Sequence, residues 1–147
     1  EFYRIEFSKV KDVCGTSPEP AEIIKSLKQK GLKLALATNP IFPKIATESR
    51  IGWAGLNKED FEIITTCENC VYSKPNPKYF VSISEQLGVK PEECLMVGND
   101  VGDDMPAKDI GMQVFLLTEN LINKTEHSIE CYPNGNYGKL KSFLETI

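Results

Sequence analysis

The sequence has no long apolar run, no surplus of basic residues and no even set of cysteines, and each absence narrows what the protein can be. None of its apolar segments approaches the roughly 20 residues that span a bilayer. Its 17 basic and 21 acidic residues give a formal charge of −4, which argues against a surface that tracks nucleic-acid phosphates. Its 5 cysteines cannot all pair, as those of an oxidised secreted scaffold would. We therefore expect a cytoplasmic protein with neither a membrane nor a nucleic acid as partner.

What the sequence does contain is a regular alternation of helix and strand patterns over its 147 residues. Amphipathic spacing with stop signals predicts helices, and short apolar or β-branched runs predict strands. The expected helices cover 20–30, 44–53, 78–87, 103–110 and 137–146, and the expected strands cover 32–37, 61–66, 94–97 and 113–117. Residues 118–135 are expected to be irregular. This order predicts a Rossmann-like three-layer α/β/α fold with a mainly parallel sheet, whose strands end at a common edge.

Polar side chains stand at the expected strand ends and in the loops that follow. They are Thr38 and Asn39, Lys74, and Asp100 with Asp103 and Asp104. A hydroxyl and an amide bind a phosphoryl oxygen, an ammonium neutralises its charge, and carboxylates are the hard ligands that Mg²⁺ prefers. Taken alone, each has an ordinary explanation as a turn hydroxyl, a solvated cation or the acidic first turn of a helix. Their order and spacing together indicate a phosphoryl-transfer site.

Three segments carry a family resemblance: residues 34–40 (LALATNP), 73–77 (SKPNP) and 96–105 (MVGNDVGDDM). They resemble the second, third and fourth motifs of the haloacid dehalogenase superfamily of phosphohydrolases, in particular its phosphoglycolate-phosphatase-like branch. The resemblance extends from about Pro18 to Leu117. It implies a Rossmann-like sheet, dependence on Mg²⁺, an aspartyl-phosphate intermediate and a small phosphorylated metabolite as substrate.

The same resemblance implies a role for each polar residue. Thr38 and Asn39 bind the transferring phosphoryl group, and Lys74 steadies it beside the nucleophile. Asp100 ligates Mg²⁺ directly, and Asp104 helps to position the metal or its water, with Asp103 as the alternative. Thr38 and Lys74 are thus the expected catalytic residues, and Asp100 and Asp104 the expected metal residues.

The first motif of the family, an apolar strand that ends in Asp-x-Asp, is missing from the sequence. In the family its first aspartate attacks phosphorus and its second serves as general acid and base. Only Asp12 comes near, but two lysines precede it and Cys14 stands where the acid belongs. A central parallel strand is almost wholly apolar, so we expect no nucleophile in this chain, with Asp12 as the alternative.

The missing motif and the absence of an initiator methionine predict that the chain is a fragment of a larger protein. We expect residues 1–17 to be the end of a cap region with its return linker, and residues 18–147 to be the C-terminal part of the core domain. Each unpaired buried backbone group at the lost strand's place costs about 1–3 kcal/mol, which favours filling by another segment or by self-association. The chain alone is expected to be inactive.

The expected function is a Mg²⁺-dependent phosphomonoester phosphatase, present as a fragment without its nucleophile. Two alternatives stay open: a non-catalytic phosphate-binding or regulatory module, and a phosphomutase of the same superfamily, which shares every motif present. Cys67 and Cys70 have the spacing of metal-binding or redox pairs. A structural zinc needs four ligands, and the pair lacks the helix start of a thioredoxin-like site, so we interpret both as ordinary loop cysteines.

Overall fold

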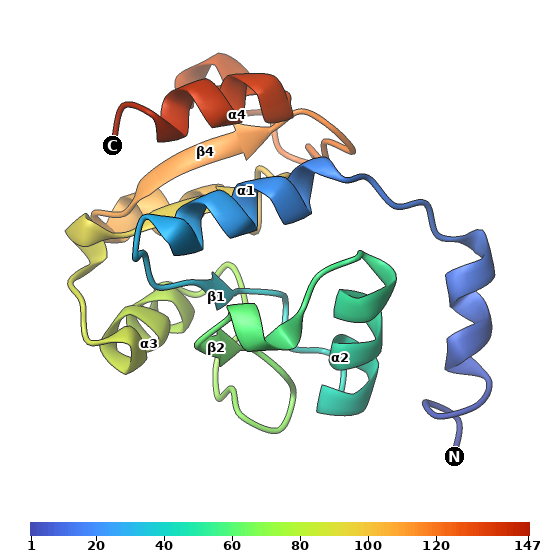
Figure 1. The fold of residues 1–147 in the computed structure, drawn as a ribbon. Helices are drawn as coiled ribbons and strands as arrows, with labels where there is room; N and C mark the ends of the chain where they lie inside the picture. Colours follow the sequence, from blue (N-terminus) through green and yellow to red (C-terminus); the bar gives the residue numbers. More distant parts are fainter. The chain divides into compact units, whose positions relative to one another are not determined.

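Helices and short strands alternate along the chain in the computed structural model, which describes all residues from Glu1 to Ile147 (Figure 1). The α-helices are α1 (Glu19–Gln29), α2 (Lys44–Trp53), α3 (Pro77–Leu87) and α4 (Tyr137–Leu144). The strands are β1 (Ala35–Leu36), β2 (Ile63–Ile64), β3 (Leu95–Gly98), β4 (Gln113–Leu117) and β5 (Asn134–Gly135). The 3-10 helices are η1 (Phe7–Val13), η2 (Lys58–Asp60), η3 (Pro91–Glu93), η4 (Met105–Ile110) and η5 (Ile129–Cys131). None of the helices combines the length and the apolar character needed to cross a bilayer.

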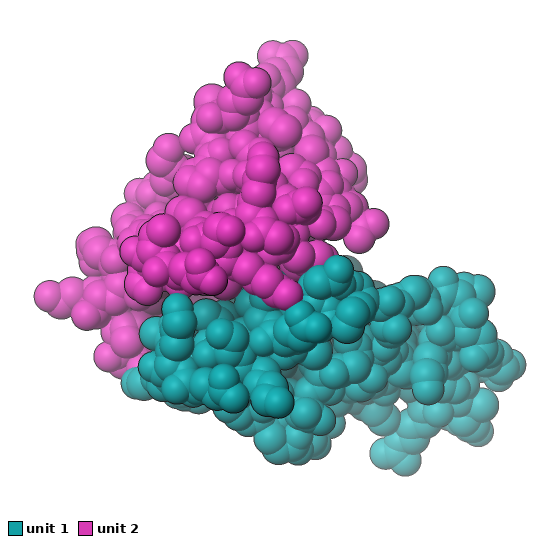
Figure 2. All heavy atoms as spheres, turned by 45° about the horizontal axis from the view of Figure 1, so that its top comes forward, with its two compact units in different colours: residues 1–71 teal, residues 72–147 magenta.

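The chain divides into two compact units, residues 1–71 and residues 72–147 (Figure 2). In the first unit β1 pairs with β2, and in the second unit the sheet order is β3-β4-β5. Every pair is parallel, which confirms the predicted α/β fold with a mainly parallel sheet. Strands β1 and β3 are each paired along one edge only. The predicted division at residue 17 stays a prediction.

The first unit contains an aromatic cluster that joins its N-terminal segment to α2. Phe7 is buried, and its ring centroid lies 5.3 Å from that of Trp53 and 5.7 Å from that of Phe42. Trp53 is the only tryptophan of the chain and is the last residue of α2. Burial of large aromatic rings therefore attaches η1 to the body of this unit.

The second unit is built around β4. Val114, Phe115 and Leu116 of this strand are buried, as are Leu140 and Leu144 of α4. Helix α4 lies along β4 (Figure 1), and the two elements are in contact. Within the sheet, β4 lies between β3 and β5, and β3 pairs with β4 from Leu95 opposite Gln113 to Gly98 opposite Leu116. The carboxyl end of β3 leads directly into the candidate site.

The local sequence explains where α3 begins and ends. The side chain of Asn76 accepts a hydrogen bond from the backbone N–H of Lys78, and Pro77 occupies the first helical position, where its missing N–H costs nothing. Gly88 ends the helix in the left-handed conformation, with φ of 69°, which glycine adopts without strain. The start of α3 sets the position of the loop that carries Lys74.

The structure departs from the predicted elements in three places. The helix expected over 103–110 is the 3-10 helix η4, which begins at Met105. The backbone N–H of Asp104 donates to the Asp100 carbonyl and so forms a turn before the helix begins. The strands expected over 32–37 and 61–66 are shorter in the structure, with two residues each in β1 and β2. The segment expected to be irregular contains η5 and the short strand β5, whose Asn-Gly sequence carries no strand periodicity.

Candidate functional site

The second unit brings three of the predicted residues together beyond the end of β3. Lys74 lies shortly before α3, Asp104 directly precedes η4, and these two helices are in contact. The ammonium of Lys74 donates to Asp104 Oδ1 at 2.5 Å, and the two side chains are only 9% and 6% exposed. The pair is a buried, charge-assisted hydrogen bond, and removal of either partner would leave the other charge unpaired inside the protein.

The second oxygen of Asp104 is also bound by the protein. Its Oδ2 accepts from the backbone N–H of Asp100 at 3.0 Å, so Lys74 and the Asp100 backbone occupy both carboxylate oxygens. Asp104 is buried against Gly98, where any Cβ would overlap the carboxylate. Asp104 therefore holds the lysine and the turn that follows β3 in one fixed arrangement.

Asp100 is presented differently from Asp104. Its Oδ1 accepts from the backbone N–H groups of Gly102 at 2.9 Å and Asp103 at 3.0 Å, which fixes the orientation of the carboxylate. Its Oδ2 has no hydrogen-bond partner, and the residue is half-buried. Asp103 contributes its backbone to this turn. Asp100 thus offers one oriented carboxylate oxygen to a ligand.

The carboxylate oxygen that Asp100 offers suits Mg²⁺, because this ion needs few ligands from the protein. Mg²⁺ keeps several waters and is commonly held by one or two carboxylates together with phosphate oxygens. Asp100 provides one such oxygen, and no three or more histidine, cysteine or acidic side chains are placed so that together they could hold a metal ion. Asp104 has both oxygens occupied, which fits the positioning role that the resemblance implies for it. The remaining ligands would come from water, from a bound phosphate or from a further segment.

The first unit holds Thr38 and Asn39 at the end of β1. Thr38 Oγ1 donates to the Thr65 carbonyl at 3.2 Å, and Thr65 Oγ1 donates to the Thr38 carbonyl at 2.8 Å. Thr65 is 1% exposed and also lies 3.2 Å from the Leu36 carbonyl. Thr65 is not among the residues predicted from the sequence, although Thr65 follows β2 much as Thr38 follows the parallel strand β1. The predicted gathering of Thr38 with Lys74 and Asp100 involves both units and stays a prediction.

Asp12, the alternative nucleophile, lies in η1. Its side chain is exposed, and η1 follows a turn at the chain start rather than a buried strand. A nucleophile at the end of a central parallel strand is held by backbone pairing that Asp12 does not have. The structure therefore gives no support to Asp12 as the attacking group.

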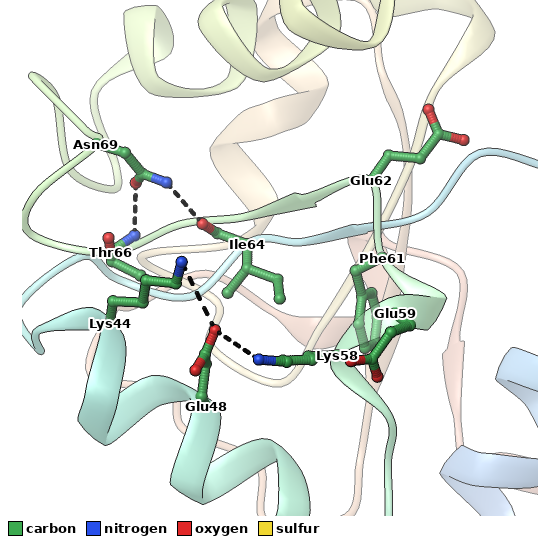
Figure 3. A pocket seen from close by; sticks show the side chains of 9 residues that line it. All are labelled: Lys44, Glu48, Lys58, Glu59, Phe61, Glu62, Ile64, Thr66 and Asn69. Atoms are coloured by element: carbon green, nitrogen blue, oxygen red, sulfur yellow. Dashed lines mark hydrogen bonds and ion pairs between the residues drawn. The ribbon is translucent and has the colours of Figure 1, made fainter.

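A pocket of about 380 Å³ in the first unit lies apart from the predicted site residues (Figure 3). It is lined by Lys44, Glu48, Lys58, Glu59, Phe61, Glu62, Ile64, Thr66 and Asn69. Its two lysines share one carboxylate: Glu48 Oε1 lies 3.9 Å from Lys44 Nζ and 3.4 Å from Lys58 Nζ. Three acidic residues outnumber these cations, so the pocket is unsuited to a phosphate group.

The fold and the site define an α/β protein whose second unit carries a buried lysine–aspartate pair and a carboxylate suited to a cation beyond the end of a parallel strand. The family model for haloacid dehalogenase-like hydrolases matches residues 5–111, and the chain belongs to this family. The match confirms the family resemblance carried by the three segments.

Curated relatives agree with this assignment, and a solved structure agrees with the fold. The chain is 32% identical over 114 residues to the bifunctional riboflavin kinase/FMN phosphatase of Arabidopsis thaliana. The aligned region covers 78% of this chain and 29% of that protein. It is 32% identical over 92 residues to the pyrophosphatase PpaX of Halalkalibacterium halodurans. That aligned region covers 63% of this chain and 41% of the relative. The crystal structure of a HAD phosphatase from Thermococcus onnurineus superposes with a TM-score of 0.70 at 24% identity, over 87% of this chain and 57% of that one. The chain spans half or less of the length of these curated relatives.

Proposed function

We propose that the chain is the phosphoryl- and metal-binding part of a Mg²⁺-dependent phosphomonoester phosphatase. The observation that carries this proposal is the buried pair of Lys74 and Asp104, whose Nζ and Oδ1 lie 2.5 Å apart; Asp104 belongs to the same turn as the oriented carboxylate of Asp100. Membership of a hydrolase family and the phosphatase names of relatives support it.

Lys74 serves phosphoryl transfer through donors that are already in place. An ammonium has three N–H groups, and Asp104 accepts from only one of them. The others can donate to a phosphoryl oxygen and to the attacking carboxylate, whose charges the lysine neutralises in a site from which water is largely excluded. Because Asp104 fixes the ammonium beforehand, no reorganisation is needed as charge develops in the transition state.

Asp100 is the residue that would hold Mg²⁺, through its unpaired Oδ2. The bound ion would neutralise charge on the transferring phosphoryl group. Thr38 and Asn39 would donate to the same group, with the Thr38 hydroxyl turning away from the Thr65 carbonyl that it now contacts.

The attacking aspartate of this proposal comes from a segment outside the present sequence. No two aspartates of the chain are spaced as Asp-x-Asp, and Asp12 lies in an exposed 3-10 helix. Strand β3 has an unpaired edge, and its apolar residues Leu95 and Val97 are only partly buried. A parallel strand added along this edge would cover them and deliver its carboxyl end beside Asp100.

The test of the activity is hydrolysis of p-nitrophenyl phosphate by the whole protein. We expect turnover that requires Mg²⁺, stops with EDTA and falls to the EDTA level in Asp100→Asn. Lys74→Met should lower kcat by about 10²–10³-fold, as loss of a preorganised donor does, whereas Lys78→Met removes an exposed lysine of α3 and should leave kcat unchanged. Turnover that survives both EDTA and Asp100→Asn would refute the metal assignment.

A binding measurement on the present chain separates an enzyme part from a regulatory module. We expect inorganic phosphate to raise the Tm of the chain, and Mg²⁺ to raise it further only while Asp100 is intact. If the whole protein binds phosphate in this way but hydrolyses no phosphomonoester, the chain is a binding module and the phosphatase proposal fails.

A further inference from the structure

The turn from Thr66 to Cys70 in the first unit holds two thiols on one turn of backbone. The N–H groups of Asn69 and Cys70 both donate to the Thr66 carbonyl, each at 3.2 Å. The Asn69 side chain fixes the turn, since its Oδ1 accepts from the Thr66 N–H at 2.8 Å and its Nδ2 donates to the Ile64 carbonyl at 2.8 Å (Figure 3). Residues three apart on such a turn have their Cβ atoms about 5–6 Å apart.

A disulfide needs Cβ atoms about 3.5–4.5 Å apart, so Cys67 and Cys70 can be joined once the turn between them tightens by about 1–2 Å. All five cysteines are free thiols, Cys67 is exposed and Cys70 is partly exposed. In sequence, the other three cysteines stand far from any second cysteine. The pair is therefore the one place where the local backbone itself brings two thiols together.

We propose that Cys67 and Cys70 form a reversible disulfide by exchange with a low-molecular-weight disulfide such as oxidised glutathione. The exposed Cys67 thiolate attacks one glutathione sulfur, which releases one glutathione thiolate and leaves a mixed disulfide on Cys67. The Cys70 thiolate then attacks the Cys67 sulfur and releases the second glutathione. The two protein thiols lose two electrons and two protons, which the glutathione disulfide takes up as it becomes two thiols.

The environment of the pair sets the rate of this exchange. Desolvation raises the pKa of the Cys67 thiol, and the adjacent Glu68 carboxylate raises that pKa further. Burial likewise raises the pKa of Cys70. Exchange requires the thiolate, so oxidation is slow at neutral pH. As the pH rises toward the thiol pKa, the rate of oxidation increases by about tenfold for each pH unit.

The disulfide would close across Glu68, the residue that caps α2. Both Glu68 carboxylate oxygens accept from the backbone N–H of Lys44 at 2.9 Å, and the Cys67 N–H donates to the Phe42 carbonyl at 3.0 Å. The Cys67 thiol donates to Glu68 Oε2 at 3.6 Å, a contact that oxidation removes. The redox state of the pair is thereby coupled to the start of α2.

The experiment uses oxidised glutathione and a chain in which Cys14, Cys94 and Cys131 are replaced by serine. We expect the intact mass to fall by two hydrogen atoms with no glutathione retained, and the change to reverse with dithiothreitol. In the same background Cys70→Ser should retain one glutathione on Cys67. Two glutathione adducts without a cross-link, or no reaction at any pH, would overturn the proposal.

Two further measurements keep the outcome clear if the triple variant folds poorly. In the natural chain, the tryptic peptide that begins at Glu59 contains both cysteines, and its mass should fall by two hydrogen atoms after oxidation. Glu68→Gln should accelerate cross-linking several-fold by removing the carboxylate beside Cys67, whereas Glu59→Gln, an exposed glutamate of the same unit, should leave the rate unchanged. Cross-links from Cys67 to any cysteine other than Cys70 would contradict the assignment.

Discussion

The carboxylate of Asp104 lies where Gly98 would carry its Cβ if it were any other residue. This close approach lets Asp104 reach the Asp100 N–H with one oxygen and Lys74 with the other. A glycine at the end of β3 is thus a condition for the whole arrangement, although it contributes no side chain to it.

The first prediction concerns this glycine. Gly98→Ala should lower the free energy of unfolding by about 1–3 kcal/mol, because Asp104 must move and the Lys74 pair is disturbed. Gly52→Ala is the matched control: a Cβ there, in the last turn of α2, meets no atom within 4 Å, so the change should stabilise the chain by up to about 0.5–1 kcal/mol. Urea unfolding followed by circular dichroism measures both, and equal stability of the two variants would contradict the crowding argument.

The second prediction concerns the reciprocal hydrogen bonds of Thr65 and Thr38. Thr65→Val keeps the shape of a buried side chain but leaves the Thr38 carbonyl without its hydroxyl donor, whereas the Leu36 carbonyl still accepts from the Thr65 backbone N–H. We expect a loss of about 1–3 kcal/mol in the free energy of unfolding. Thr65→Ser keeps the hydroxyl and should cost about 0.8 kcal/mol for the lost methyl group. A valine variant as stable as the natural chain would show that the hydroxyl is unimportant.

The third prediction is a pH dependence that arises from Glu68. The Lys44 backbone N–H and then the Thr66 hydroxyl hold the pKa of the Glu68 carboxyl below its ordinary value. Because the folded-state pKa is the lower one, the charged carboxylate contributes its full stabilisation above the ordinary value of about 4.3, and the contribution disappears as the pH falls through the folded-state pKa.

Glu68→Gln should therefore flatten the fall in unfolding free energy below about pH 4.3. Lys44→Ala should retain the natural pH dependence, because the backbone N–H that binds Glu68 survives the substitution. Chemical unfolding at a series of pH values distinguishes the two. If Lys44→Ala flattened the curve as much as Glu68→Gln, the lysine side chain rather than its backbone would be the partner.

Much of the fold follows from short-range patterns. Helix α2 has the predicted limits, and α3 begins one residue early at Pro77, because capping residues and glycine stops act locally. Strand β4 is also as predicted, since its apolar run is buried in the second unit. The two-residue strand β5 could not be predicted, because it exists only through pairing with Leu116 and Leu117.

The chemistry of the site was less accessible to sequence reasoning than its location. Motif order pointed to Lys74, Asp100 and Asp104, but the difference between the two aspartates depends on which backbone N–H groups each accepts. The roles of Thr65 and Glu68 arise from contacts between segments distant in sequence, with Thr38 and Lys44 respectively. No periodicity or motif encodes such contacts.

The ring contact of Phe7 with Trp53 has a practical consequence, because Trp53 is the only indole of the protein. Its fluorescence reports on one small region, the place where η1 meets the end of α2. Detachment of the N-terminal segment would expose the indole to water and shift its emission to the red while the sheet around β4 stays intact. The protein therefore carries an optical probe for local opening of residues 1–13, separable from global unfolding seen by circular dichroism.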